Sequence, residues 1–122
     1  MTKTSKPHGI TLYGIKNCDT VRKARHWLDS HAITYRYHDF RDDGLTLDTI
    51  DQWLARSTAG QLLNKRSTTW KQLDDATRNQ LDDDAIPALL AAHPTLVKRP
   101  VLDTGGELTV GFSDTAWQQL LL

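Results

Sequence analysis

The chain has 122 residues, and its 15 Lys and Arg balance 15 Asp and Glu, so the formal net charge at pH 7 is zero. This length suits a single domain with its own core, while the balanced charge argues against the dense basic surface that nucleic-acid-binding proteins need. The single cysteine excludes an internal disulfide and is typical of the reducing cytoplasm. The sequence shows neither an apolar signal segment at its start nor an apolar run long enough to span a membrane.

The first predicted elements are a strand over about 10–13, a tight polar loop and a helix over about 18–30. The apolar face of this helix consists of Val21, Ala24 and Leu28. A second alternation of apolar and polar residues over 33–37 predicts another strand. The order strand, helix, strand implies a parallel pair with a right-handed crossover.

A long stretch of helical character follows the second strand. Thr46 is a candidate N-cap for its first helix. The apolar face of that helix is expected to contain Leu47, Ile50 and Leu54. Shorter helices are predicted over 60–63, 71–81 and 85–92, and Pro94 ends the last of them.

The last predicted elements are two short strands and a helix. The strands, over 101–102 and 108–112, are joined by a Gly-containing hairpin turn, and Ser113 is a candidate cap for the closing helix. The order βαβ, helices, ββα predicts an α/β fold with a mixed sheet of four strands. We expect a single domain over 1–122, with a helical insertion at about 45–95.

Cys18 stands at the predicted start of the first helix. A helix N-terminus presents unpaired N–H groups and a partial positive charge, which together favour the reactive thiolate form. Lys16 and Arg22 add positive potential, and Asp19 opposes it. A lone cysteine can equally serve as a small buried hydrophobe, so its position leaves a structural role open. No histidine forms a recognised ligand pair with Cys18, and no metal site is expected.

A second candidate for chemistry is Arg99-Pro100, at the entry to the strand over 101–102. Proline is tolerated at the first position of a strand, where no ladder N–H is required. A cis peptide bond here would leave the backbone before the proline free to pair with an extended peptide. X–Pro bonds are cis in about 5% of cases, so the sequence leaves the isomer open.

These motifs together resemble the arsenate reductase (ArsC) and Spx-related family. The resemblance covers about 9–121 and rests on Leu12-Tyr13, Cys18, Arg22-Lys23-Ala24, His93-Pro94, Arg99-Pro100-Val101 and Val110-Gly111-Phe112. Within the family the chain is most similar to the small YffB-like branch, at 14–20 and 64–70. The resemblance implies a thioredoxin-like fold with a helical insertion and the activity of a glutathione-dependent thiol reductase.

Cys18 is the expected nucleophile of such a reductase. A thiolate that attacks a disulfide forms a mixed disulfide, which a second thiol must resolve. Two-cysteine reductases hold the second thiol three positions on, where this chain has Val21, so an external thiol is required. Glutathione is the abundant cytoplasmic candidate, and its carboxylates suit charge-assisted pairs with basic side chains. The residues expected to bind it are Lys16, Arg22, Asn64, Arg66, Arg99 and Pro100, and Arg99 is also expected to act in catalysis.

The same resemblance makes arsenate a poor substrate. Arsenate reductases of this type hold the oxyanion with three arginines, of which this chain retains Arg99 and carries Asn64 and Gly111 at the other two positions. If each charged hydrogen bond contributes about 1.5–3 kcal/mol, the loss of two costs several kcal/mol. Arg66, two residues from Asn64, is a candidate substitute.

The alternative function is regulatory and not enzymatic. Spx-like relatives bind RNA polymerase, which makes the polymerase α subunit a candidate partner, and the neutral charge of this chain fits contacts with protein more than direct contacts with DNA. Those regulators use a pair of cysteines as a redox switch, however, and Val21 stands where the second cysteine would be.

Overall fold

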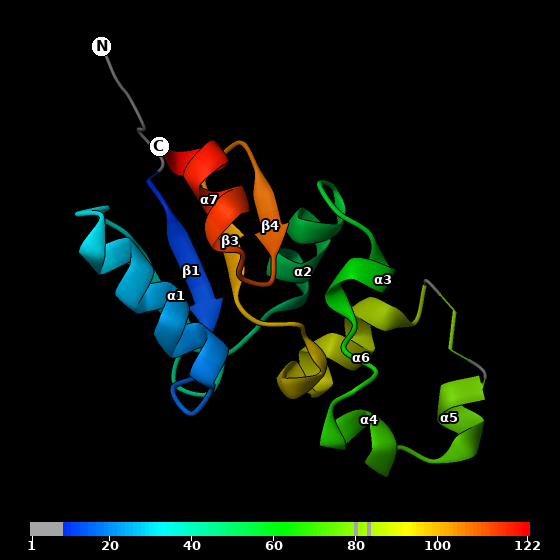
Figure 1. Ribbon diagram of the computed structural model, residues 1–122. Helices are drawn as coiled ribbons and strands as arrows, with labels where there is room; N and C mark the ends of the chain where they lie inside the picture. The colour runs from blue at the N-terminus through cyan, green and yellow to red at the C-terminus, as the bar shows by residue number, and fades with distance from the viewer. Residues whose placement is uncertain (1–8, 80, 83) are drawn as a thin grey trace. The chain divides into compact units, whose positions relative to one another are not determined.

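The structure is a computed structural model, which describes residues 9–79, 81–82 and 84–122. The chain divides into two compact units. The sheet unit combines Met1–Asp42 with Arg99–Leu122, and the helical unit is Asp43–Lys98 (Figure 1). The expected absence of a signal segment concerns the first eight residues, which lie outside the described ranges.

The sheet unit contains a four-stranded mixed sheet with the strand order β2-β1-β3-β4. Its strands are β1 (Thr11–Gly14), β2 (Arg36–Asp39), β3 (Val101–Asp103) and β4 (Leu108–Val110). Strand β1 pairs in parallel with β2 and antiparallel with β3, and β3 pairs antiparallel with β4. The predicted α/β fold with a thioredoxin-like βαβ–ββα order is therefore confirmed.

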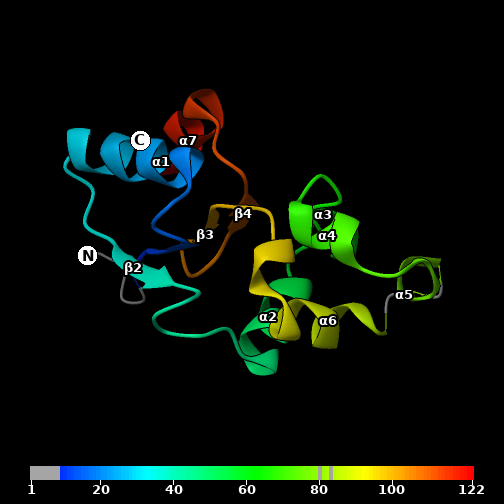
Figure 2. The ribbon, with the colours of Figure 1, turned by 90° about the horizontal axis from the view of Figure 1, so that it is seen from below.

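Two helices, α1 (Asp19–Ser30) and α7 (Asp114–Leu121), lie on one face of the sheet (Figure 2). The core between them consists of Ile10, Leu12, Ala24, Trp27, Leu28, Leu102 and Trp117. Trp27 and Trp117 meet edge to face with ring centroids 5.6 Å apart, and Nε1 of Trp27 donates a 2.8 Å hydrogen bond to Asp114. Burial of each large side chain contributes about 1.5–3 kcal/mol, so this cluster holds both helices to the sheet.

The ends of the predicted strands differ from the observed ones. The strand predicted over 33–37 is observed as β2 at Arg36–Asp39, because the turn after α1 takes up the preceding residues and Ile33 N–H donates to Leu28 O. Strand β4 ends at Val110, since Gly111 has a positive φ of 87° and leaves the extended conformation.

The helical unit is built from short helices around its own apolar core. They are α2 (Leu47–Leu54), α3 (Ala59–Leu62), α4 (Thr68–Gln72), α5 (Asp75–Asn79), α6 (Ile86–Ala92) and the 3-10 helix η1 (Pro94–Leu96). The fully buried side chains include Ile50, Trp53, Leu62, Leu90 and Leu96. None of the helices in the described ranges is long and apolar enough to cross a membrane.

Two predictions for the helical unit are corrected by the structure. The helix predicted over 71–81 is interrupted at Leu73, which is extended, and α5 begins after Asp74, whose side chain accepts a 2.7 Å hydrogen bond from Thr77 N–H. Leu47 is 48% exposed and does not join the buried face of α2. The capping role of Thr46 is confirmed, because its side chain accepts from Thr49 N–H.

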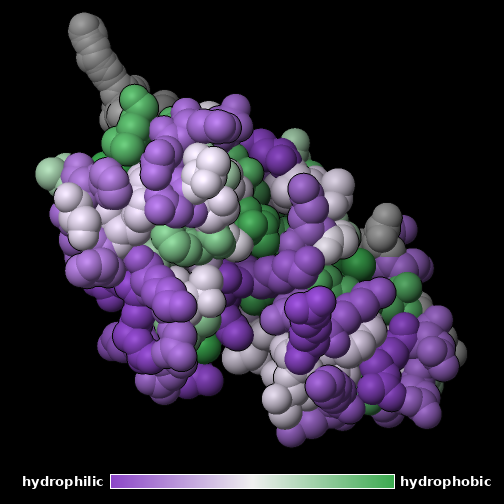
Figure 3. All heavy atoms as spheres, viewed as in Figure 1, coloured by the Kyte–Doolittle hydropathy of each residue, from purple (hydrophilic) through white to green (hydrophobic). Residues whose placement is uncertain are grey.

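The surface facing the viewer in Figure 3 is mostly hydrophilic over both units. Among the described residues, the large hydrophobic side chains that stay exposed are Leu47 and Leu122. Isolated exposed apolar residues of this kind are normal on proteins and mark no patch.

Candidate functional site

One edge of the sheet gathers residues from all four strands. The register pairs Gly14 with Asp39, Tyr13 with Val101, and Val101 with Val110. Strands β1, β2 and β4 therefore end at this edge, and β3 begins there. The edge carries Asp39, Pro100, Gly111 and the loop from β1 to Cys18.

Cys18 is the N-cap of α1 and is a free, half-buried thiol. Its backbone is extended, with φ −108° and ψ 122°, and its carbonyl accepts a 3.0 Å hydrogen bond from Arg22 N–H. Its side chain makes no capping hydrogen bond. The predicted position at the start of the helix is confirmed, with the sulfur not engaged as a cap.

The loop before Cys18 is fastened to strand β2 through Asp39, which is 3% exposed. Oδ2 of Asp39 accepts from Lys16 N–H at 3.1 Å and from the Tyr37 hydroxyl at 3.2 Å. Oδ1 accepts from the N–H groups of Arg41 and Asp42 at 2.8 and 3.1 Å. Burial by itself raises the pKa of Asp39, but these hydrogen bonds outweigh it and hold the pKa below its ordinary value.

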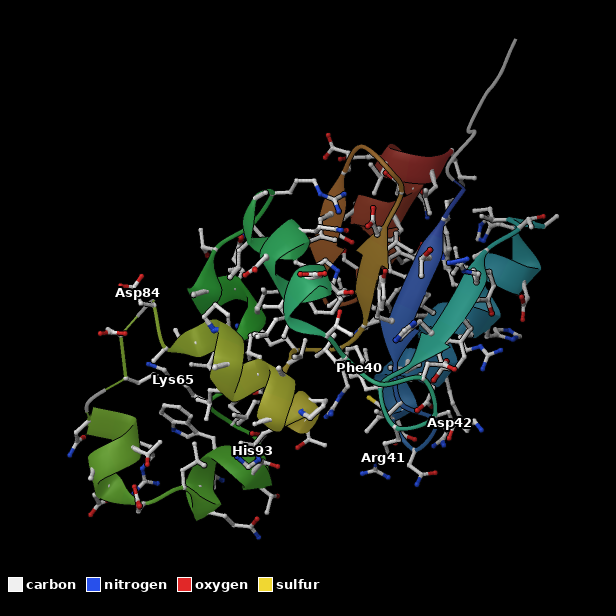
Figure 4. All side chains as sticks on the ribbon, turned by 180° about the vertical axis from the view of Figure 1, so that it is seen from behind. Phe40, Arg41, Asp42, Lys65, Asp84 and His93 are labelled. Atoms are coloured by element: carbon white, nitrogen blue, oxygen red, sulfur yellow. The ribbon has the colours of Figure 1, made fainter. Side chains whose placement is uncertain are left out.

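Phe40, Arg41 and Asp42 follow β2 directly in the chain, in the segment labelled in Figure 4. Phe40 is buried, while the Asp42 carboxylate meets Nζ of Lys16 at 2.6 Å. Arg22 pairs in the same way with Asp19. Two of the cations expected to bind glutathione thus have acidic partners, in exposed pairs of the kind that contribute about 0–1 kcal/mol and exchange readily.

Arg99 and Pro100 lead into β3 at the same edge. The peptide bond between them is cis, which the sequence left open. The carbonyl of Pro100 accepts a 2.8 Å hydrogen bond from Gly111 N–H. Nη1 of Arg99 is buried and has no hydrogen-bond partner among the described residues. Buried polar groups in proteins are nearly always paired, so an unpaired guanidinium nitrogen suggests a site for an anionic ligand.

Asn64 and Arg66 belong to the helical unit, in the segment between α3 and α4. Asn64 N–H donates to Leu96 O at 2.7 Å, and Oδ1 of Asn64 accepts from Arg66 N–H at 3.0 Å. The Arg66 side chain is exposed. Their participation in a site with Cys18 stays a prediction.

Asp39 is the residue that the sequence prediction missed. Asp39 continues the every-second-residue pattern of Tyr35 and Tyr37, both of which are half-buried. An acidic side chain on the same side of the strand as these tyrosines was the signal that could have identified it. Its significance depends on the pairing of β1 with β2, which brings it to Lys16 across 23 positions of sequence.

Comparison with known proteins gives a consistent result. Residues 13–120 match the model of the ArsC family. An uncharacterized protein of Haemophilus influenzae is 46% identical over 109 residues, which are 89% of this chain and 96% of that protein. The global transcriptional regulator Spx of Listeria innocua is 29% identical over 119 residues, which cover 92% of this chain and 86% of the regulator.

Two solved structures are similar along almost the whole chain. A YFFB protein superposes with a TM-score of 0.89 and 40% identity, covering 93% of this chain and 99% of its own. An arsenate reductase (ArsC) related protein from Brucella melitensis has a TM-score of 0.74 and 41% identity, covering 95% and 98%. The expected resemblance to the YffB-like branch is confirmed.

Proposed function

Because the chain belongs to the ArsC family, we propose that it is a glutathione-dependent monothiol reductase with Cys18 as its nucleophile. The observation that carries the proposal is a free thiol at the N-cap of α1 together with Arg99, which leads into β3 at the same sheet edge and has an unpaired, buried Nη1. The N–H groups at a helix N-terminus favour a negatively charged partner, and an unpaired guanidinium nitrogen favours an anion.

The reaction proceeds through two exchanges. In the first, the Cys18 thiolate attacks the glutathione sulfur of a mixed disulfide RS–SG, forms Cys18–S–SG and releases RS⁻, which takes up a proton. In the second, the thiolate of another glutathione attacks the glutathione sulfur of that adduct, releases glutathione disulfide and restores the Cys18 thiolate. The balance is RSSG plus GSH giving RSH plus GSSG, with no further oxidant or reductant.

Arg99 binds a carboxylate of glutathione and keeps the tripeptide beside the thiol. Lys16 contributes to the same recognition by exchanging its exposed partner Asp42 for the ligand. Pro100 lies at the entry to β3, and the extended tripeptide pairs with the backbone of Arg99 before it, since the N–H of Lys98 is already bound to Leu62 O. Binding is expected to be weak, because a tripeptide loses much rotational freedom and its carboxylates stay partly solvated.

Arsenate is not the proposed substrate. Of the three cations that the resemblance assigns to an oxyanion site, Gly111 replaces one, and its φ of 87° disfavours a side chain at that position. Asn64 replaces another, and its Oδ1 already accepts a hydrogen bond from Arg66 N–H. A coupled glutathione–glutaredoxin assay with arsenate is expected to show little or no turnover, and robust turnover would refute this assignment.

The proposed activity is tested by glutathione-dependent reduction of a glutathionylated peptide, coupled to glutathione reductase and NADPH. Parent protein should accelerate NADPH consumption, and Cys18→Ser should reduce it to the uncatalysed rate. The Arg99→Ala variant should lose about tenfold in kcat/KM, the equivalent of one charged hydrogen bond. Arg36→Ala, which removes an exposed cation of β2, serves as the matched control and should retain the parent rate.

The identity of 29% to the Spx regulator favours a second candidate, a non-enzymatic regulator that binds the RNA polymerase α subunit. This candidate predicts that immobilised protein captures purified α subunit and that Cys18→Ser captures it equally well. The reductase assignment predicts the loss of turnover in that variant. Capture by both proteins combined with no turnover by the parent would make the regulator the better assignment.

A further inference from the structure

The carboxylate of Asp39 joins two loops at the sheet edge that carries Cys18. Its Oδ2 holds the loop after β1 through Lys16 N–H, and its Oδ1 holds the segment after β2 through the N–H groups of Arg41 and Asp42. One buried side chain thus fixes the relative positions of two backbone segments that are more than 20 residues apart in sequence.

The loop that Asp39 holds is short and ends at the thiol. Lys16, whose N–H binds Asp39, stands two residues before Cys18, and the intervening residue Asn17 is exposed. The Cys18 side chain makes no capping hydrogen bond that would fix the loop from its other end. Ile15 is buried and anchors the start of the loop, and Asp39 supplies a polar attachment at Lys16, two residues before the sulfur.

The same carboxylate also determines where one cation of the site lies. Lys16 and Asp42 are both attached to Asp39 through their backbone N–H groups, and this brings Lys16 Nζ to 2.6 Å from the Asp42 carboxylate. Displacing either loop would separate this pair and move Lys16.

The contacts of Asp39 require an acceptor at both oxygens. Oδ1 receives two backbone N–H groups, and Oδ2 receives one backbone N–H and the Tyr37 hydroxyl. An asparagine has the same shape but replaces one carboxylate oxygen with an NH₂ group. That NH₂ group would face donors and could not accept their hydrogen bonds. The guanidinium of Arg25 lies 4.0 Å from the centre of the Tyr37 ring, and this contact helps to hold the Tyr37 hydroxyl in place.

We propose that Asp39 is the positioning residue of this site, which sets the loop so that the Cys18 thiol is presented for disulfide exchange and Lys16 is placed beside it. The inference rests on the proposed function only for the choice of glutathione disulfide as the partner, and the role of Asp39 in placing the thiol does not depend on it. Asp39 acts through the loop, and no contact of Asp39 with the reacting sulfur is required.

The test compares two disulfides reacting with folded protein under pseudo-first-order conditions. Hydroxyethyl disulfide is small and neutral and reports the presentation of the thiol alone, while glutathione disulfide reports recognition as well. Asp39→Asn is expected to slow the reaction with hydroxyethyl disulfide about tenfold, because misplacement of a reacting group carries costs of this order. The reaction with glutathione disulfide should slow by more than about tenfold, since Lys16 is displaced as well. Asp51→Asn, an exposed acidic residue of α2, is the matched control and should change neither rate.

A purely structural role of Asp39 gives the opposite result. A loosened fold exposes a half-buried thiol and speeds its reaction, whereas loss of positioning slows it in protein that circular dichroism shows to be folded. An unchanged or faster reaction of Asp39→Asn with hydroxyethyl disulfide overturns the inference. If that variant does not fold, Tyr37→Phe removes one donor from Oδ2 and should slow the reaction two- to threefold, and an unchanged rate in this variant overturns the inference equally.

Failure of the proposed function is seen separately. Parent protein that reacts with hydroxyethyl disulfide but not with glutathione disulfide contradicts glutathione dependence. In that case the effect of Asp39→Asn on the hydroxyethyl disulfide rate still decides whether Asp39 positions the thiol.

Discussion

Gly14 and Val21 stand so close together that a Cβ atom built on the glycine would lie 2.7 Å from Cγ2 of the valine. The last residue of β1 and the first turn of α1 are thus in contact through a position that accepts no side chain. This contact lets the loop between them be short and keeps Cys18 at the sheet edge. It is the apolar counterpart of the polar attachment through Asp39.

Gly14→Ala should therefore destabilise the protein by about 1–3 kcal/mol, the usual cost of overfilling a packed contact. The free energy of unfolding in urea measures the effect. Gly60→Ala is the control, because a Cβ at Gly60 meets nothing within 4 Å, and it should not lower stability. Adding Val21→Ala to Gly14→Ala should make room for the new methyl group, so the double variant should lose less stability than the two single variants lose together. A loss equal to the sum of the two single losses would contradict the assigned contact.

The depressed pKa of Asp39 makes stability depend on pH. The folded state prefers the carboxylate, so its contribution is fully present above the unfolded pKa of about 3.9 and is lost as the pH falls through the lower, folded value. The free energy of unfolding of the parent should therefore fall more steeply below about pH 4 than that of Asp39→Asn. Parallel pH profiles for the two proteins, measured by urea unfolding, would show that the Asp39 carboxylate is not stabilised by folding.

Tyr37 provides an independent probe of the same contact. Burial, followed by the negative charge of Asp39 and the hydrogen bond to it, raises the pKa of Tyr37 to about 12. In Asp39→Asn the charge is absent, so the pKa should move down toward the ordinary value of about 10, while burial still keeps it raised. NMR titration of ¹³C-labelled tyrosine rings measures the pKa of Tyr37 in both proteins. An identical pKa in the two would show that the Asp39 charge does not act on Tyr37.

The pair of Lys16 and Asp42 predicts an effect on ligand affinity. Asp42→Asn removes the negative charge that pairs with the Lys16 ammonium and lies near the bound carboxylates, so reduced glutathione should bind about two- to fivefold more tightly. Chemical-shift titration of the Cys18→Ser background measures the dissociation constant without thiol chemistry, and added salt should narrow the difference. Asp51→Asn is the control with the same change of charge. If it raised the affinity for glutathione as much as Asp42→Asn does, a local effect through Lys16 would be excluded.

Much of the fold could be predicted because its signals are local. Thr46 and Ser113 were expected as helix caps, and each accepts a hydrogen bond from the N–H three residues on. The apolar face of α1 was expected from helical spacing and is buried. The helix predicted over 71–81 was wrong as one element, since Asp74 binds the Thr77 backbone and starts a new helix there.

The site was less predictable, because its order comes from tertiary pairing. The sequence identified Cys18 and Arg99 as single residues with suitable chemistry. It did not show that Asp39 and Lys16 meet, because their contact requires the parallel register of β1 with β2. Nor did it show that Lys16 and Arg22 have acidic partners, while Nη1 of Arg99 lacks a hydrogen-bond partner in the described part of the chain.

The most direct test of the central claim is the product that forms when the protein reacts with excess glutathione disulfide. Intact-mass spectrometry with peptide mapping should find one glutathione per chain, attached to Cys18, and reduced glutathione should remove it. Cys18→Ser should gain no adduct, and Arg99→Ala should form the adduct about tenfold more slowly. A parent protein that stays unmodified, or that yields only a dimer joined through Cys18, would contradict glutathione-dependent catalysis by this thiol.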